Sequence, residues 1–117
     1  DAHGNLANLL SGAGNADEAR EHFEMALRLR PGDAATRYNY AMLLARIKHY
    51  DDAQRELEAA LRADPEFGDA HLLLSDLLMA KGQVREAIPH LRKAAGGSDA
   101  AGREKATRLL RQLGMTP

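Results

Sequence analysis

Residues 33–65 read DAATRYNYAMLLARIKHYDDAQRELEAALRADP, and this stretch decides the fold of the chain. Each half places apolar side chains three or four residues apart, which is the spacing of one face of an α-helix. The first stripe consists of Tyr40, Leu43, Leu44 and Ile47, and the second of Ala53, Leu57, Ala60 and Leu61. The polar break HYDD separates the two halves, and the final Asp-Pro stops the second helix. The stretch therefore predicts a helical hairpin, two amphipathic helices joined by a tight turn.

The same pattern recurs both upstream and downstream, with a period of about 34 residues. The matching sets are Ala19, Ala53 and Ala87; Ala26, Ala60 and Ala94; Phe23, Leu57 and Leu91; Leu10, Leu44 and Leu78; and Pro31 with Pro65. The small residues of each unit allow its two helices to approach closely, and the large residues fill the space between neighbouring hairpins. A single hairpin cannot bury both of its stripes, so the pattern predicts a stack of such hairpins.

This period and its residue pattern resemble the tetratricopeptide repeat. The motif of that family runs large-x-x-L-small-x-x-large, then A-x-x-x-F-x-x-A, then P. Residues 6–31 and 40–65 follow it to the proline, and residues 74–94 follow it with Asp99 in the proline slot. The slot of the family's early tryptophan holds His3, Arg37 and His71. The resemblance covers the chain from its first residue to about residue 99.

The resemblance implies an all-α fold, a right-handed superhelical solenoid of antiparallel helix pairs with about seven helices. We expect one domain over residues 1–117, with repeats at about 1–33, 34–67 and 68–99 and a capping helix at about 100–113. The expected helices span about 2–11, 16–29, 34–47, 50–63, 68–80, 84–95 and 101–113. The first expected helix begins at the start of the chain with nothing covering its outer side. We therefore expect that the parent protein continues upstream with further helices, and that this segment covers its open end by self-association or a crystal contact.

The last expected helix carries Ala106, Leu109, Leu110 and Leu113 on one face. These residues fit the slots of the first helix of a repeat if one residue is inserted between residues 96 and 102. Leu110 then falls where complete repeats hold Ala or Ser, so no following helix needs to approach it closely. This register predicts a cap, apolar inside and polar outside.

The composition excludes several functional classes. The 117 residues carry a formal net charge of −1, which gives no overall electrostatic bias toward nucleic acid or an anionic membrane. The basic last helix has no aromatic residues for base stacking, so we expect no nucleic-acid binding. No apolar run approaches the ~20 residues that a membrane-spanning helix needs, so we expect no membrane insertion. The chain has no cysteine, which excludes disulfides and thiolate chemistry and leaves the compartment open.

The residues that could carry chemistry form no catalytic or metal-binding pattern. None of the five histidines stands three or four residues from another, the spacing that metal sites on helices use. His3 and His71 share one repeat position, and His22 and His90 share another. Paired acidic residues stand at helix starts, where they complement the helix dipole. We therefore predict that the chain is not an enzyme and holds no metal and no cofactor.

The family resemblance places a concave groove along the first helices of the repeats. Asn5 and Asn39 share one register there, and Asn8 lies one turn beyond Asn5. An amide side chain both donates and accepts, so it can pair with a peptide backbone of any sequence. The predicted ligand-binding residues are Asn5, Asn8, Tyr38, Asn39, Met42, Arg46, Leu72, Asp76 and Met79. The alternative interpretation is that these asparagines are solvated polar residues on an exposed helix face.

Some members of this family hold C-terminal carboxylates in a clamp of two asparagines and three cations. Asn8 and Asn39 match the asparagine slots, but the cation slots hold Gly4, Asp69 and Leu73. A clamp without cations cannot neutralise a carboxylate, so we expect no binding of chaperone tails.

Two functional classes remain open at this point. The first is a non-catalytic interaction module that binds a partner protein or peptide in its groove. The second is the repeat arm of a larger enzyme or biogenesis factor, of the glycosyltransferase or cytochrome-maturation type. Both interpretations assign protein binding to this chain.

Overall fold

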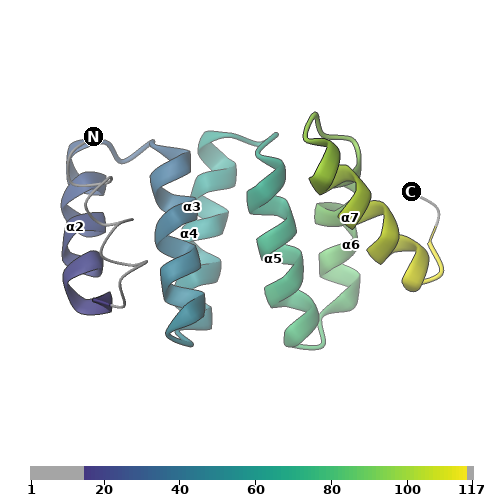
Figure 1. The fold of residues 1–117 in the computed structure, drawn as a ribbon, viewed down its shortest axis with the longest axis horizontal. Helices are drawn as coiled ribbons and strands as arrows, with labels where there is room; N and C mark the ends of the chain where they lie inside the picture. The colour runs from purple at the N-terminus through teal and green to yellow at the C-terminus, as the bar shows by residue number, and fades with distance from the viewer. Residues whose placement is uncertain (1–14, 116–117) are drawn as a thin grey trace. The chain divides into compact units, whose positions relative to one another are not determined.

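The computed structural model describes residues 15–115 of the chain. Within these residues it contains six α-helices and no strand, so the predicted all-α helical-repeat class is confirmed (Figure 1). The helices are α2 (Ala16–Leu29), α3 (Ala34–Arg46), α4 (Tyr50–Ala63), α5 (Gly68–Ala80), α6 (Val84–Ala95) and α7 (Ala100–Gln112). The helix expected over residues 2–11 lies outside the described residues, as does the N-terminal end expected to self-associate.

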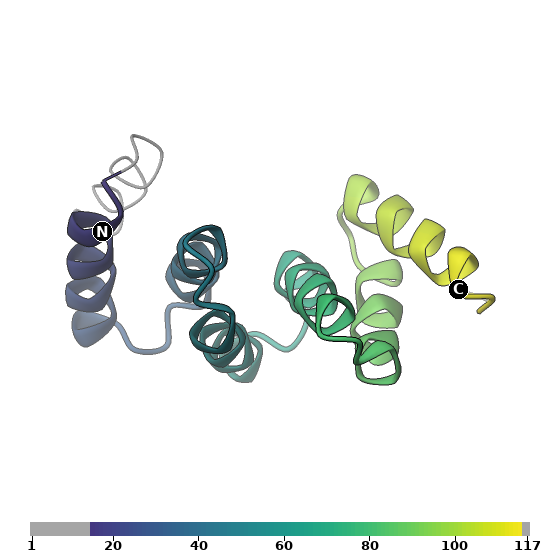
Figure 2. The ribbon, with the colours of Figure 1, turned by 90° about the horizontal axis from the view of Figure 1, so that it is seen from below.

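The chain divides into two compact units, Asp1–Ala63 and Asp64–Pro117. In the first unit α3 and α4 form an antiparallel hairpin, and α2 packs against α3. In the second unit α5 and α6 form the corresponding hairpin, and α7 packs against α6 and also contacts α5 (Figures 1 and 2).

The small residues of the repeat lie where the two helices of a hairpin meet. Ala41 of α3 and Ala53 of α4 are both completely buried, and so are Ser75 of α5 and Ala87 of α6. The Ser75 hydroxyl donates to the backbone carbonyl of Leu72 at 2.7 Å, so this buried polar group is satisfied within its own helix. The close approach predicted from the sequence is thus present in both hairpins.

Three helices end in the same backbone turn. In each, an N–H group just beyond the helix donates to a leucine carbonyl five positions earlier in the chain, as in a Schellman motif. The pairs are His49 to Leu44 at 2.7 Å, Gln83 to Leu78 at 2.8 Å and Met115 to Leu110 at 2.9 Å. The residue before each donor has a positive φ, 67° at Lys48, 79° at Gly82 and 77° at Gly114. Glycine adopts this conformation without steric cost, whereas Lys48 adopts it against the preference of an L side chain.

This turn sets the register of α7. Leu110 ends α7 as Leu78 ends α5, and the step from Leu78 to Leu110 is shorter by two positions than the step from Leu44 to Leu78. The expectation of one inserted residue before α7 is therefore wrong, because the segment between α5 and α7 is two residues shorter than in a full repeat. In the observed register Thr107, and not Leu110, takes the small position that Ala41 and Ser75 hold.

Side-chain caps start two of the helices. The Asp33 carboxylate accepts from the Thr36 N–H at 3.3 Å at the start of α3. The Asp99 carboxylate accepts from the Gly102 N–H at 2.9 Å at the start of α7. Asn15 precedes α2 without a side-chain cap hydrogen bond.

Candidate functional site

The exposed face of α3 carries four of the predicted ligand-binding residues. Tyr38 and Asn39 are half-buried, Arg46 is exposed, and the Met42 side chain is 44% exposed. Met42 is thus one of the few large apolar residues that α3 presents to solvent. Asn5 and Asn8, the remaining predicted asparagines, lie outside the described residues.

The opposite side of α3 is held by a polar contact that the sequence did not reveal. Arg37 donates through Nε to the Pro31 carbonyl at 2.9 Å and through Nη1 to Glu56 of α4 at 2.9 Å. Both side chains of this ion pair are only about one-fifth exposed, 22% for Arg37 and 21% for Glu56. The contact therefore ties the turn before α3 and the second helix of the hairpin to one guanidinium group.

An aromatic contact joins α3 to α2. The rings of Tyr40 and Phe23 stack with centroids 5.3 Å apart, and both side chains are buried. Burial, reinforced by the nearby Glu24 carboxylate, raises the pKa of Tyr40 above its usual range. The negative charge that Tyr40 acquires only when it ionises at high pH, together with its hydrogen bond to Arg20, raises the pKa of that guanidinium. Tyr40 is thus a neutral core residue hydrogen-bonded to a permanently charged Arg20.

The predicted residues on α5 lie in three different environments. Leu72 is only 8% exposed and belongs to a core cluster with Leu91, Ala94, Ala106 and Leu110. It lies against α6 and α7 and offers little surface to a ligand, contrary to the groove position expected from the sequence. Asp76 is half-buried and pairs with Lys105 of α7 at 3.4 Å. Met79 is half-buried. Asp76 and Met79 therefore remain the candidate contacts on this helix.

Two histidines of the second unit also form a contact that sequence spacing did not predict. The Nδ1 atoms of His71 on α5 and His90 on α6 lie 2.9 Å apart, and the rings are tilted by 34°. His71 Nε2 lies 2.7 Å from the Pro65 carbonyl oxygen. A carbonyl oxygen can only accept, so His71 Nε2 carries a proton in this contact. The repeat pattern could have indicated this contact, because His71 occupies the same repeat position as Arg37, the position of the missing tryptophan.

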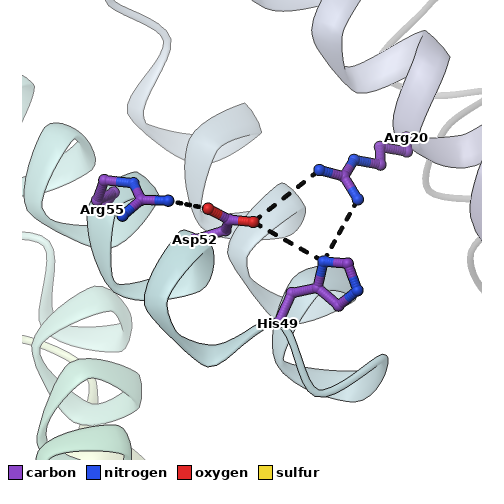
Figure 3. Close-up of polar contacts among 4 residues, drawn as sticks. All are labelled: Arg20, His49, Asp52 and Arg55. Atoms are coloured by element: carbon purple, nitrogen blue, oxygen red, sulfur yellow. Dashed lines mark hydrogen bonds and ion pairs between the residues drawn. The ribbon is translucent and has the colours of Figure 1, made fainter.

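A four-residue polar network lies in the first unit (Figure 3). The Asp52 carboxylate pairs with Arg55 one turn further along α4. Arg20 of α2 lies 4.0 Å from the same carboxylate, and its Nη1 lies 3.4 Å from His49 Nδ1. His49 Nδ1 is in turn 3.8 Å from Asp52. All four side chains are at least one-third exposed, so this network bridges α2 to α4 at the surface and has the character of a structural contact.

The described residues hold no group of three or more His, Cys, Asp or Glu side chains that could bind a metal ion. Within residues 15–115 no helix is both long enough and apolar enough to span a membrane. The faces of α3 and α5 offer hydrogen-bonding, charged and apolar contacts, which are the means of binding another chain.

The family comparisons agree with the repeat pattern. The family described as Tetratricopeptide repeat matches residues 1–66 and, separately, residues 48–97. A similar curated protein is the inactive TPR repeat-containing thioredoxin TTL3 of Arabidopsis thaliana, 30% identical over 86 residues, or 74% of this chain. The TPR repeat-containing thioredoxin TTL4 of the same plant is 33% identical over 84 residues, or 72% of this chain. The chain spans only 12% of the length of either relative.

Solved structures share the fold over nearly the whole chain. YrrB, whose structure is described as a TPR protein with an unusual peptide-binding site, is 29% identical with a TM-score of 0.80, over 96% of this chain and 59% of its own. The first TPR of Spaghetti (RPAP3), solved with the HSP90 peptide SRMEEVD, has a TM-score of 0.82 at 15% identity, over 97% of this chain and 94% of its own. The Sgt2 TPR domain of Aspergillus fumigatus has a TM-score of 0.79 at 21% identity, over 97% of this chain and 80% of its own.

Proposed function

Because the chain belongs to the tetratricopeptide repeat family, we propose that it is a non-catalytic interaction module that binds a segment of a partner protein. The observation that carries the proposal is the face of α3, where Met42 is 44% exposed beside half-buried Asn39 and Tyr38. An exposed methionine adapts its shape to different apolar side chains. Asn39 can donate to and accept from the backbone of an extended segment. Together these groups suit an extended peptide that is recognised through its backbone and one or two apolar side chains.

The face of α5 contributes contacts of the same kind in the second unit. Met79 supplies apolar surface, and Asp76 supplies a carboxylate whose charge Lys105 partly balances. Lys105 pairs at the surface, so a ligand cation can compete with it at small cost. We propose Asp76 and Met79 as ligand contacts, and we leave Leu72 out because it is a core residue.

The comparisons support a peptide or protein as the class of ligand. YrrB, at 29% identity, is described as having a peptide-binding site, and the Spaghetti repeat was solved with a bound peptide. The alternative remains that the chain is the repeat arm of a larger enzyme or biogenesis factor, of the glycosyltransferase or cytochrome-maturation type. Under that alternative the binding role proposed for this chain is the same, and the activity belongs to another part of the parent.

We propose further that the ligand is not an acidic C-terminal tail of the SRMEEVD type. The clamp slots that require cations hold Asp69 and Leu73 on α5, of which Asp69 is exposed. An exposed carboxylate in that place repels the carboxylates of such a tail. Titration of SRMEEVD followed by calorimetry should give no measurable binding, and binding at micromolar concentration would contradict this part of the proposal.

The binding face can be tested without knowing the natural partner. Peptides selected from a random display library against the chain should include binders that shift the NMR signals of α3 residues. The double variant Asn39→Ala/Met42→Ala should weaken such a binder by about 1–3 kcal/mol, from lost backbone pairing and apolar contact. The matched control is Glu58→Ala/Arg62→Ala on the exposed side of α4, which should leave affinity unchanged. Selected peptides that bind the α3 variant as tightly as the wild type would exclude this face.

A further inference from the structure

Within residues 15–115 no helix covers the outer side of α7, whereas the first helices of the two complete hairpins are covered on this side by α4 and α6. Ala41 of α3 and Ser75 of α5 are completely buried under α4 and α6. Thr107 takes the same register position on α7 but is only half-buried. No described helix packs against this side of α7 (Figures 1 and 2). In place of a covering helix there is an open groove of about 790 Å³.

Small residues and charged residues both line this groove. Ala95 from the end of α6, Ala100 and Thr107 leave the space empty because their side chains are short. The charged residues along it are Arg103, Glu104, Arg108 and Arg111, with Gln112 at one end. Three arginines against one glutamate make the groove basic in a chain whose formal net charge is −1.

The arginines are available to an incoming carboxylate. Within residues 15–115 neither Arg108 nor Arg111 has an ion-pair partner. Arg103 Nη1 donates to the carbonyls of Gly97 and Ser98, at 3.2 Å and 3.1 Å. These two bonds hold the Arg103 guanidinium in place and leave its other N–H groups unused.

In the first unit, the side of α3 that corresponds to the groove side of α7 is covered by α4. Arg103 stands at the register position of Arg37, and each donates to a carbonyl six residues earlier. Arg37 also pairs with Glu56 of α4 at 2.9 Å. Beside Glu56, α4 brings the fully buried Ala53 and Leu57 against its partner helix. A helix that carries a small residue, a glutamate and a large apolar residue at the spacing of Ala53, Glu56 and Leu57 therefore complements α7. Its glutamate can pair with Arg103, and its small residue can pack against Thr107.

We propose that the groove between the end of α6 and the outer side of α7 binds an acidic amphipathic helix of another protein. Its small residues would pack over Thr107 and Ala95, and its carboxylates would meet Arg103, Arg108 and Arg111. This surface differs from the faces of α3 and α5 assigned above, so the two proposals stand or fall separately.

The peptide YDDAQRELEAALRA, which copies α4, is a suitable probe because it has the required pattern and a net negative charge. A fluorescein-labelled, N-acetylated and C-amidated form should bind the intact chain, and a form with Gln at the position of Glu56 should bind more weakly. Arg108→Gln/Arg111→Gln should reduce affinity about five- to tenfold, as expected for two exposed charge pairs. Thr107→Trp, which fills the groove, should abolish binding. The charge-matched control Arg30→Gln/Arg62→Gln, at exposed positions of the first unit, should change affinity less than twofold.

Several outcomes would overturn the proposal. Equal weakening by the control variant would mean non-specific attraction, and unchanged binding to both groove variants would place the probe elsewhere. If a single-stranded oligonucleotide displaced the labelled peptide and bound more tightly than the peptide does, the groove would be a nucleic-acid surface instead. Concentration-dependent dimerisation that Thr107→Trp abolishes would assign the groove to a second copy of this chain. Circular dichroism and thermal melting of each variant would show whether it keeps its fold. Variants of the α3 face should leave the affinity for the probe unchanged.

Discussion

The Nδ1 atoms of His71 and His90 face each other across α5 and α6 at 2.9 Å, so only one proton can lie between them. His71 donates through Nε2 to Pro65, which leaves its Nδ1 as the acceptor when the ring is neutral. His90 must then donate through Nδ1. This contact and the Arg37–Glu56 pair occupy the same two positions of successive repeats. Each hairpin is thus fastened by a different polar pair at one place.

The histidine contact should appear as an energetic coupling. His71→Ala and His90→Ala, each alone and together, should give a coupling of about 0.5–1.5 kcal/mol in urea unfolding, the net value of one hydrogen bond in a half-buried site. A cycle of His71→Ala with Arg85→Ala, an exposed residue of α6, serves as the control and should be additive. Additivity of the two histidine substitutions would mean that the contact contributes nothing to stability.

Replacing Lys48 by glycine should stabilise the chain. Lys48 has φ of 67° at the end of α3, and Gly82 has φ of 79° in the same turn after α5. Removal of the Cβ at Lys48 should relieve about 1 kcal/mol of backbone strain, seen as a higher denaturation midpoint. The reciprocal Gly82→Ala change should destabilise by a similar amount, although open space surrounds that position. A Lys48→Gly variant that is no more stable than the wild type would contradict the strain argument.

Tyr40 should make stability fall at high pH. Its pKa is raised in the folded state by burial, so the stability linked to its neutral form is complete below its unfolded pKa of about 10. This contribution is lost as the pH rises through the higher folded value. The unfolding free energy of the wild type should therefore decline above pH 10 more steeply than that of Tyr40→Phe, which cannot ionise there. Parallel pH profiles from urea titrations would show that Tyr40 is not responsible.

Leu110 should be essential for α7. Its side chain is completely buried in the cluster that also contains Leu91 and Ala106. Leu110→Ala should lower the free energy of unfolding by about 2–4 kcal/mol through lost burial and a residual cavity. Arg111→Ala, an exposed neighbour, should change it by less than about 0.5 kcal/mol. Hydrogen exchange should show faster exchange in α6 and α7 of the Leu110 variant, and wild-type protection there would mean that α7 is a loosely held segment.

The candidate surfaces could be predicted only in part. Asn39 and Met42 lie on the exposed part of α3, because their positions follow from the helical period and the buried stripe. Leu72 was placed in the groove by the same reasoning, yet α6 and α7 bury it. A helical period states which residues share a face, but it does not state which neighbouring helix covers that face.

The sequence by itself determined the all-α class, the helix positions and the small residues at the hairpin contacts, because periodicity and helix-stopping residues act locally. Only the structure decided the register of α7, and only the packing of α5 on α6 decided the partner of His71. Residue spacing allowed α7 to be shifted by about one helical turn while keeping the same apolar face, since about 3.6 residues return a helix to its starting side. The hydrogen bond from Met115 to Leu110 removed that ambiguity. The pairing of His71 with His90 depends on how closely two helices pack, and no single helix contains that information.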